Sequence, residues 1–513
     1  MNGAVQSMTP PTQSARPKML NALLDGIARD VPSLQVTDLT LDSRNVRPGA
    51  AFIALQGART HGLSFASQAF EKGATVLLWE SAQGVAVPVV PANVTCIEIA
   101  DLARQLGTIA DRFFDQPSLA MDITAVTGTN GKTTTAFMLA AAFERIGRDA
   151  AYAGTLGYGR VAAVHARPHT TPDCITVHRE LAELHAAGVR CVGMEVTSHA
   201  LDQHRVAGVR FDGAIFTNLT RDHLDYHGTF EAYGAAKERL FDWPTLKYAV
   251  VNVEDSFGRQ LAERQERVPL TICGRASTTS EFVQSKNYAR HVAARSIKLN
   301  PVGLDIELDT SWGKGSLHSR LIGAFNVDNV LAVLASLLTA DVPFADALKV
   351  MASGVAPPGR MEMLTSPGKP LVVVDYAHTP DALEKALHAV RQHCAGKLWC
   401  VFGCGGERDA GKRPLMGAIA ETNADGVIVT DDNPRGEDGD AIVAGILAGI
   451  RMPERVHTQR DRARAIEDAI SQAHSADAVL IAGKGHEDYQ IVGGITRHFS
   501  DREVALAALR RRA

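Results

Sequence analysis

The residues from Gly128 to Thr134, Gly-Thr-Asn-Gly-Lys-Thr-Thr, are of types that together can bind a nucleoside triphosphate. Phosphates are multiply charged, so a loop that binds them needs many N–H donors and little steric bulk. Glycines let backbone N–H groups close round the β-phosphate, Lys132 can neutralise the β/γ oxygens, and the Thr133 hydroxyl can bind Mg²⁺. The motif follows an apolar run, 122–127, and opens an Ala-rich run, which predicts strand, loop and helix. We therefore predict an ATP site, although the two glycines stand three rather than five residues apart.

Carboxylates and histidines follow two further apolar runs. Glu195 lies near the end of the run 191–196, where an acid at the carboxyl end of a parallel strand is well placed to bind Mg²⁺. An exposed strand-end carboxylate is the alternative. Two Asp and two His, among them His223, stand within residues 222–227 and suggest a second metal or phosphate contact. Lys237 follows on a helix-like run, and its spacing alone predicts a solvated helix residue.

Composition limits what kind of protein can hold these residues. The chain has 513 residues, a net charge of −4, 45% hydrophobic and 21% charged residues, which indicates a soluble globular protein without a broad basic surface for nucleic acid or anionic lipid. Seven cysteines without a CxxC pair exclude a disulfide framework and indicate a reduced, cytoplasmic setting. No apolar run reaches about 18 residues, so no transmembrane helix is expected.

Strand-like apolar runs alternate with helix-like runs over most of the chain. Because crossovers between parallel strands are usually helical, this alternation predicts parallel α/β sheets. The runs are 74–79, 122–127, 191–196, 213–218, 248–253, 371–377, 398–403, 426–430 and 478–483. Pro- or Gly-containing seams at 113–122 and 354–364 divide the chain. The predicted domains are 1–117, with about 1–18 as a flexible tail, 118–353 and 354–513.

Six motifs occur together and in a fixed order. They are Gly128-Thr-Asn-Gly-Lys-Thr-Thr134, Glu195-Val-Thr-Ser-His199-Ala-Leu, Asn218-Leu-Thr-Arg-Asp-His223-Leu-Asp, Ala236-Lys237, Gly323-Ala-Phe-Asn326-Val-Asp-Asn329 and Asp375-Tyr-Ala-His378-Thr-Pro. With them the chain resembles the Mur ligases, ATP-dependent amide-forming enzymes of peptidoglycan precursor assembly, from about Leu39 to Glu487. The resemblance implies an α/β fold of three domains: a smaller N-terminal uridine-nucleotide-binding domain, a central P-loop ATPase domain with a mostly parallel sheet, and a C-terminal Rossmann-like amino-acid-binding domain.

The resemblance also implies a reaction. An acyl phosphate forms from ATP on the D-glutamyl γ-carboxylate of UDP-N-acetylmuramoyl-L-alanyl-D-glutamate, and meso-2,6-diaminopimelate is then added, with Mg²⁺ as cofactor, by a cytoplasmic monomer that binds neither nucleic acid nor membrane. The motif Asp432-Asn-Pro-Arg435 resembles the signature of members that add diaminopimelate rather than L-lysine. Diaminopimelate has one carboxylate more than lysine, and a guanidinium fork grips a carboxylate in two hydrogen bonds. An Asn-Pro turn with an exposed arginine is the alternative interpretation of the motif.

Two other functions stay open as alternatives. One is an L-lysine-adding ligase of the same family. The other is a P-loop nucleotide switch without ligase chemistry, although the chain has no Asn-Lys dipeptide and therefore lacks the base-reading Asn-Lys-x-Asp motif of switch GTPases.

Residue roles follow from the resemblance position by position. Catalytic residues are Lys132, Glu195, His223 and Lys237. The metal is held by Thr133, Glu195, His223 and Lys237, the last carbamylated by CO₂, which reverses its assignment as a solvated residue. ATP contacts are Gly128, Thr129, Asn130, Gly131, Lys132, Thr133, Thr134, Asn326, Arg360 and Asp375. Contacts to the uridine-nucleotide dipeptide are Leu41, Ser43, Thr170, Thr171, Thr197, Gln203 and Arg205. Contacts to diaminopimelate are Arg408, Asp432, Asn433, Pro434, Arg435, Gly483 and Glu487. His169 departs from the family pattern, where Asn or another small polar residue is expected.

Overall fold

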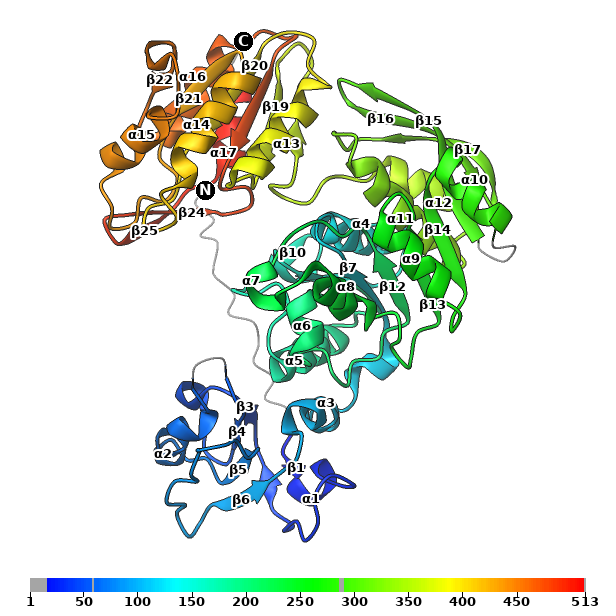
Figure 1. Ribbon diagram of the computed structural model, residues 1–513, viewed down its shortest axis with the longest axis vertical. Coiled ribbons are helices and arrows are strands. Elements are labelled where there is room, and N and C mark those ends of the chain that lie inside the picture. The colour runs from blue at the N-terminus through cyan, green and yellow to red at the C-terminus, as the bar shows by residue number, and fades with distance from the viewer. Residues whose placement is uncertain (1–15, 58–59, 286–289, 512–513) are drawn as a thin grey trace, which may run out of the picture. The chain divides into compact units, whose positions relative to one another are not determined.

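The computed structural model describes residues 16–57, 60–285 and 290–511 (Figure 1). By its internal contacts the chain forms two compact units. Unit 1 comprises residues 1–128, 148–214 and 221–247, and unit 2 comprises residues 129–147, 215–220 and 248–513. One of the boundaries between the units along the chain falls inside strand β12 (Gly213–Phe216).

The first part of unit 1 is a small parallel sheet in the order β3-β4-β5-β6. Its strands are β3 (Leu39–Thr40), β4 (Ala51–Ala54), β5 (Val76–Trp79) and β6 (Thr95–Glu98). Successive side chains of a strand point to opposite faces. Ala51 and Ile53 accordingly pack in the cluster that holds helix α3 (Leu102–Phe113), whereas Phe52 packs with helix α2 (Ala66–Glu71). A short pair, β1 (Lys18–Met19) and β2 (Gln35–Val36), and helix α1 (Leu20–Leu23) precede this sheet.

The second part of unit 1 carries a sheet in the order β10-β9-β8-β11-β7. Its strands are β7 (Asp122–Thr127), β8 (Ala150–Gly154), β9 (Gly157–Arg160), β10 (Ala163–His165) and β11 (Cys191–Glu195). The pairs β8–β11 and β11–β7 are parallel, and β9 and β10 are added antiparallel. The helices are α5 (Cys174–Ala186), α6 (Ser198–Asp202), α7 (Leu224–His227) and α8 (Phe230–Glu238). The side chains of Asp173, Thr197 and Thr229 cap the first turns of α5, α6 and α8, which fixes where these helices begin.

Unit 2 begins with helix α4 (Lys132–Arg145) and continues with strands in the order β13-β14-β15-β16-β17. The strands are β13 (Tyr248–Asn252), β14 (Leu270–Arg275), β15 (Arg290–Asn300), β16 (Gly303–Thr310) and β17 (Gly313–Ser319). The first three are parallel, and β16 and β17 are antiparallel. The helices are α9 (Ser256–Arg264), α10 (Ala276–Ser285), α11 (Asn326–Thr339) and α12 (Phe344–Ala352). Helix α11 lies buried and is apolar from Val330 to Leu338 except at Ser336.

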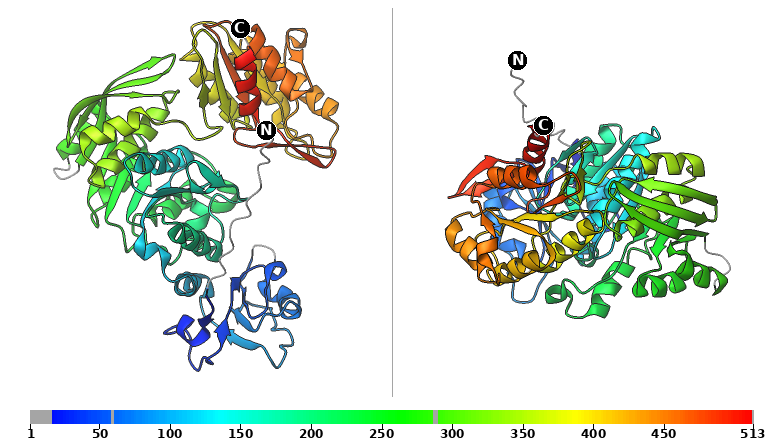
Figure 2. Two further views of the ribbon diagram at one scale, coloured as in Figure 1. Left: turned by 180° about the vertical axis from the view of Figure 1, so that it is seen from behind. Right: turned by 90° about the horizontal axis from the view of Figure 1, so that it is seen from above.

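The C-terminal part of unit 2 is a sheet in the order β18-β19-β23-β20-β21-β22, parallel except for β18. Its strands are β18 (Glu362–Leu364), β19 (Leu371–Asp375), β20 (Leu398–Phe402), β21 (Gly426–Val429), β22 (His457–Thr458) and β23 (Ala478–Ala482). One face packs on α13 (Pro380–Arg391), α14 (Lys412–Asn423) and α15 (Gly439–Leu447), and the other on α16 (Arg462–Gln472) and α17 (Asp501–Arg511) (Figures 1 and 2). A hairpin of β24 (Tyr489–Val492) and β25 (Ile495–His498) follows β23.

Several expectations can be compared directly with this fold. All nine predicted apolar runs contain a strand, and the α/β class with mostly parallel sheets is confirmed. All seven cysteines are free thiols. Across the described ranges no helix is both long and apolar enough to span a membrane. The predicted tail falls mainly on residues 1–15, outside the described residues, and Lys18 already belongs to β1. The domain boundaries at 117 and 353 stay predictions.

Candidate active site

The predicted phosphate loop leads directly into helix α4. Gly131, the residue before the helix, has φ +83°. A Cβ at this position would lie 2.3 Å from Oδ1 of Asn329, so that only glycine fits. The segment after β12 holds the loop in place: Thr129 N donates to Asn218 O (2.8 Å) and Asn130 N to Asn218 Oδ1 (3.0 Å). The backbone N–H groups at the start of α4 are the donors that a phosphate requires.

Three polar side chains complete this part of unit 2. The Nζ of Lys132 donates to Thr129 O of its own loop (2.8 Å), and Thr133 is buried in the first turn of α4. Asn326, at the start of α11, accepts from Nδ2 of Asn329 (2.8 Å). Oδ1 of Asn329 in turn accepts from the Thr135 hydroxyl (3.3 Å). The structure therefore brings predicted residue Asn326 to the phosphate loop through Asn329, which the sequence motif contains but to which we assigned no role.

Glu195 ends β11 in unit 1 and has no exposed surface. Its Oε1 accepts from Thr155 N (2.8 Å) and from the Tyr152 hydroxyl, and its Oε2 accepts from the Thr155 hydroxyl (3.2 Å). A Cβ on Gly154 would stand 2.2 Å from Oε1, so this glycine makes room for the carboxylate. The alternative of an exposed strand-end carboxylate is wrong, because the side chain turns inward to these donors.

Lys237, on α8, is only 1% exposed. Its Nζ donates to the backbone oxygen of Gly128 (2.9 Å) and lies 4.4 Å from the centre of the Tyr233 ring. The solvated position that spacing alone predicted for Lys237 is therefore wrong. The contacts that bury it come from Gly128, more than a hundred residues earlier, which helix spacing cannot reveal.

Three histidines lie close to one another near α8, the helix that carries Lys237. The exposed His223 has φ +52°, and its ring lies 4.8 Å from that of His199, which lies 5.4 Å from that of His227. Burial lowers the pKa of His199 and of His227, with the neighbouring histidines adding to the effect. Neutral imidazoles are the forms that accept hydrogen bonds or metals.

Two of the four predicted metal ligands have side chains of a type that binds Mg²⁺. Glu195 supplies a buried carboxylate and Thr133 a hydroxyl, and Mg²⁺ prefers such oxygen ligands. The imidazole of His223 is a less typical donor for this ion. Among the residues that the structure describes, no three His, Cys, Asp or Glu side chains stand close enough together to hold a metal by themselves. A Mg²⁺ ion bound here would therefore need donors of other kinds.

Five of the predicted dipeptide contacts lie together in unit 1. The Thr171 hydroxyl donates to Glu195 O (2.9 Å), and the hydroxyls of Thr155 and Thr170 are 3.1 Å apart. Arg205 donates to Thr171 O (3.0 Å) and to Oε1 of Gln203. The backbone N–H of Thr197 donates to the Thr171 hydroxyl (3.4 Å), so that Thr171, Thr197, Gln203 and Arg205 form one group, and Thr170 joins it through Thr155 and Glu195. All recorded partners of the Arg205 guanidinium among the described residues are uncharged oxygens, which leaves its charge for an anionic substrate.

The two remaining predicted contacts to the dipeptide lie in the N-terminal part of unit 1, outside this group. His169 is exposed beside Thr170. In the N-terminal sheet Ser43 is buried and its hydroxyl donates to Oε1 of Gln68 (2.6 Å), while Leu41 is partly buried against the apolar cluster under α3. The Asp42 carboxylate accepts from the backbone N–H of Arg44 and fixes this short 3-10 turn.

The carboxyl ends of the C-terminal strands hold the predicted amino-acid residues. Arg408 follows β20, Asp432 to Arg435 follow β21, and Gly483 and Glu487 follow β23. Asp375, at the end of β19, accepts from the backbone N–H groups of Met361 and Ala377 and, through its own backbone O, from Gly483 N (3.2 Å). Burial raises the pKa of Asp375, and the cation of Arg360 opposes that shift. The Arg360 guanidinium lies 4.8 Å from the Tyr376 ring.

Arg435 is the cation of this group whose surroundings are most informative. Its backbone is left-handed, φ +57°, and is held by hydrogen bonds to Ile491 O (2.9 Å) and from Gly493 N (2.7 Å) of the β24–β25 hairpin. Its Nη1 donates to Gly406 O (2.8 Å). Within the described residues it has no carboxylate within ion-pair distance, and neither has the exposed Arg408. Strained backbone and an uncompensated guanidinium are both features of binding sites.

Two carboxylates stand on the same loops. Asp432 is buried against Gly483, where a Cβ would lie 2.7 Å from Asp432 Oδ2. Burial raises the pKa of Asp432, and the cations of Arg462 and Lys484 oppose the shift. Glu487 accepts from Nδ2 of Asn433 (2.9 Å) and from the fully buried Lys484 (3.3 Å). The arrangement offers acceptors for an ammonium group and guanidinium groups for a carboxylate, which suits an amino acid.

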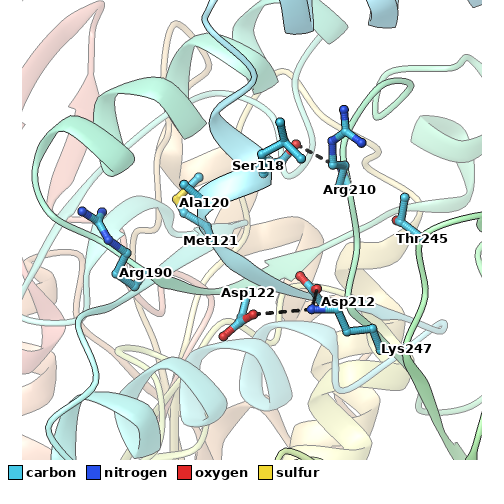
Figure 3. Close-up of a pocket in the computed structure, with 10 residues that line it drawn as sticks. Ser118, Ala120, Met121, Asp122, Arg190, Arg210, Asp212, Thr245 and Lys247 are labelled. Atoms are coloured by element: carbon cyan, nitrogen blue, oxygen red, sulfur yellow. Dashed lines mark hydrogen bonds and ion pairs between the residues drawn. The ribbon is translucent and has the colours of Figure 1, made fainter.

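A pocket of about 500 Å³ in unit 1 contains none of the predicted site residues in its lining (Figure 3). It is lined by Asp122 at the amino end of β7 and by Arg190, Asp212 and Lys247, which precede β11, β12 and β13. Lys247 pairs with Asp212 (2.7 Å) and approaches Asp122 (4.0 Å). Ligands of open parallel sheets bind outside the carboxyl ends of the strands, so this pocket is not the active site.

Comparison with known proteins gives these residues a family. Residues 35–114 match the description "Mur ligase family, catalytic domain", residues 126–337 the "Mur ligase middle domain", and residues 359–485 the "Mur ligase, glutamate ligase domain". The UDP-N-acetylmuramoyl-L-alanyl-D-glutamate--2,6-diaminopimelate ligase of Xanthomonas oryzae pv. oryzae is 49% identical over 500 residues, 96% of this chain and 98% of its own. The chain belongs to the Mur ligase family. The ligase of the same name from Pseudomonas aeruginosa is 46% identical over 493 residues, 96% of this chain and 98% of its own.

A solved structure extends the match to three dimensions. A ligase of that same name aligns with this Mur ligase over 96% of this chain and 99% of its own, with a TM-score of 0.69 and 33% identity. Family membership confirms the predicted three-domain α/β architecture and the prediction of an ATP-dependent amide ligase. The roles of individual site residues stay predictions.

Four residues of this Mur ligase that the sequence analysis left without a role have prominent contacts: Tyr152, Thr155, Arg462 and Lys484. The first two are donors to Glu195, and the last two are fully buried cations behind the amino-acid residues. A hydroxyl or a cation in an ordinary helix, strand or turn gives no sequence signal of its own. Only Lys484 lies beside a motif residue, and that proximity could have pointed to it.

Proposed function

We propose that this Mur ligase joins an amine of meso-2,6-diaminopimelate to the D-glutamyl γ-carboxylate of UDP-N-acetylmuramoyl-L-alanyl-D-glutamate, converting ATP to ADP and phosphate. The relatives that cover almost the whole chain carry this substrate pair in their names. The observation that carries the proposal is Arg435, which follows β21 and whose guanidinium has no carboxylate partner among the described residues. The reaction is placed in the cytoplasm, and the free state of all seven cysteines supports that setting.

The chemistry requires activation of a carboxylate. The γ-carboxylate attacks the γ-phosphorus of ATP, ADP leaves, and an acyl phosphate forms. The amine then attacks the acyl carbon, loses a proton, and phosphate leaves. Anions meet in the first step, so the N–H groups at the start of α4 and the Lys132 ammonium offset charge on the phosphates.

Metal binding and carbamylation are part of the proposal. When bound, Mg²⁺ would offset phosphate charge as the carboxylate approaches. The residues proposed to hold it are Thr133, Glu195, His223 and Lys237, the last as a carbamate. The oxygen donors of Glu195 and Thr133 support this assignment. Among the described residues, His, Cys, Asp and Glu side chains do not form a metal site by themselves. A carbamate on Lys237 would supply an additional anionic oxygen donor.

Recognition of the amino acid uses both signs of charge. Arg435 and Arg408 are proposed to bind the carboxylate of diaminopimelate that lysine lacks, and Asp432 and Glu487 to bind an ammonium group. A cation that loses its intended partner remains desolvated and unpaired, so lysine is disfavoured. The contacts of Arg435 with Gly406 O and the β24–β25 hairpin preset its direction.

The decisive experiment measures phosphate release with the uridine-nucleotide dipeptide and ATP, comparing meso-diaminopimelate with L-lysine. We expect turnover with diaminopimelate at least 100-fold above that with lysine. The variant Arg435→Ala should lose at least 100-fold in kcat/KM for diaminopimelate, about 3 kcal/mol or more, and keep its affinity for ATP. Arg502→Ala, which removes an arginine paired with Glu362 on the surface, is the control. Equal turnover with lysine would show a lysine-adding ligase instead.

A further inference from the structure

Arg462 and Asp501 form an ion pair that is completely withdrawn from solvent. Each is the first residue of a helix, Arg462 of α16 and Asp501 of α17. Both helices cover the face of the C-terminal sheet opposite α13, α14 and α15. Neither residue belongs to the set proposed above to bind substrate.

The guanidinium of Arg462 reaches four oxygens. Its Nε and Nη2 donate to the two carboxylate oxygens of Asp501 (2.7 and 2.8 Å), which fixes the plane of the group. Nη2 also donates to Ala482 O (2.9 Å), and Nη1 to Asp431 O (3.3 Å). One side chain therefore joins two backbone positions that are distant in sequence.

Those positions directly precede the amino-acid site. Asp431 is followed by Asp432, and Ala482 by Gly483. The two loops meet where Asp432 Oδ2 lies against Gly483, a contact so close that a Cβ there would be 2.7 Å away. Gly483 has φ +113°, so its backbone position is specific as well. Arg462 thus holds together the two loops whose spacing places the Asp432 carboxylate.

Charge points in the same direction as geometry. The carboxyl of Asp432 is buried, and its neighbours include the cations Arg462 and Lys484 and the carboxylates Glu487 and Asp501. The arginine favours the ionised form of Asp432 against the effect of burial. An ionised Asp432 can accept hydrogen bonds from an ammonium group, and a protonated one accepts fewer.

Stability alone does not account for the pair. Helices α16 and α17 already pack through Ile466, Ala469, Ala505 and Leu509, among others. Replacing a buried ion pair with apolar residues of similar volume is often neutral or stabilising, because both charges must be desolvated. Apolar side chains in these two positions could fill the space, but they could not bind the carbonyls of Asp431 and Ala482.

We propose that Arg462, oriented by Asp501, is a positioning residue of the amino-acid site, which fixes the loops carrying Asp432 and Gly483 and thereby sets the affinity for the incoming amino acid. The identity of that amino acid as diaminopimelate rests on the proposed function. The positioning role itself applies to whichever amino acid the enzyme uses.

The test compares two pairs that join the same two helices. The double variant Arg462→Met/Asp501→Leu removes the buried pair without leaving an isolated charge. The matched control, Glu467→Leu/Arg511→Met, removes the exposed pair between Glu467 on α16 and Arg511 on α17 (2.8 Å). For each, KM for diaminopimelate, KM for ATP, KM for the uridine-nucleotide dipeptide, kcat and Tm are measured. We expect the buried-pair variant to raise KM for diaminopimelate at least 10-fold, with the other two KM values within 2-fold and Tm within a few degrees, and the control to change none of them.

A single substitution guards against misfolding of the double variant. Arg462→Lys keeps the charge but lacks the planar fork, so it should raise KM for diaminopimelate by an intermediate factor while the protein stays folded. An unchanged KM for diaminopimelate in folded Arg462→Lys and in the double variant would overturn the proposal, as would an equal rise in all three KM values. Failure of the proposed function is separate: the wild type would then release phosphate with L-lysine and not diaminopimelate, and the same comparison would be made with lysine.

Discussion

Burial of Lys237 changes what an ordinary helix residue can do. A lysine amine reacts with CO₂ only when it is neutral, and a low-dielectric environment disfavours the ammonium form. The side chain lies over the Tyr233 ring, with Nζ hydrogen-bonded to Gly128 O at the beginning of the phosphate loop. The amine that we propose to be carbamylated therefore already has a defined position beside the phosphate loop.

Replacement of Lys237 tests this at the residue scale. Lys237→Ala should lower phosphate release at least 100-fold, because the proposed anionic metal ligand is lost, and short carboxylates such as acetate or propionate should restore part of the activity by entering the space left. Lys237→Arg is the matched control: it keeps a cation, cannot be carbamylated and leaves no room, so it should be inactive and not rescued. Wild-type activity in Lys237→Ala would refute the carbamate proposal.

Site residues could be proposed from the sequence where they belong to a motif. They could not be proposed where their surroundings depend on burial in the folded protein. The glycines and Lys132 of the phosphate loop can be recognised because strand, loop and helix follow one another in the chain. Glu195 could be placed at a strand end, but its burial depends on Tyr152, Thr155 and Gly154, which come from β8 and the turn after it. Contacts between distant segments leave no local pattern.

At the scale of elements, continuous apolar runs predicted strands reliably because strands buried on both faces need apolar residues at every position. Among the missed strands, β4, β8 and β14 are buried almost throughout, whereas the antiparallel additions to the sheets are more exposed. In β16 buried and exposed side chains nearly alternate, and β25 is exposed throughout. These antiparallel additions include the β24–β25 hairpin that holds Arg435, so the backbone support of the predicted specificity residue could not be foreseen.

His393 joins three elements of unit 2 and should make stability depend on pH. It follows α13 and is buried; its Nε2 accepts from Gly323 N (2.8 Å), which assigns the proton to Nδ1, the donor to Asn300 O (2.5 Å) at the end of β15. Both nitrogens are thus in use in the neutral ring. Burial lowers the pKa of His393, and the hydrogen bond to Asn300 partly opposes that shift.

The sign follows from which state binds the proton. Below about pH 6.5 an unfolded histidine is protonated, whereas folded His393 stays neutral, so the free energy of unfolding falls as the pH decreases through that value. In the His393→Gln variant we expect the free energy of unfolding to decrease less steeply between pH 7 and 5.5 than in the wild type. The two slopes should differ by up to about 1.4 kcal/mol per pH unit. Urea unfolding across this range measures it, and comparison at pH 8, where both forms are neutral, isolates the lost contacts. Parallel curves for wild type and variant would contradict the assignment.

At the scale of the whole molecule, the net charge of −4 conceals how anionic substrates bind. ATP, the uridine nucleotide and the amino acid all carry carboxylates or phosphates, and a broad field of this sign does not attract them. The cations that we propose bind them are local: Lys132 in the phosphate loop, Arg205 beside Thr171, and Arg435 and Arg408 after β21 and β20. Their surroundings are loops fixed by short hydrogen bonds.

The reaction places one demand on the chain as a whole. In the proposed mechanism the acyl phosphate forms beside residues 128–134 and the amine is bound within residues 408–487. The acyl carbon and the amine nitrogen must come within bonding distance while water is excluded, because water would hydrolyse the acyl phosphate. We therefore expect the radius of gyration measured by small-angle scattering to decrease when a non-hydrolysable ATP analogue, Mg²⁺, the uridine-nucleotide dipeptide and diaminopimelate are all present. Each ligand alone should give a smaller change, since no single one spans both sets of residues. The Arg435→Ala variant, with the same mixture, should compact less, because it binds the amino acid weakly. An unchanged radius in the saturated wild type would show that the atoms meet without closure.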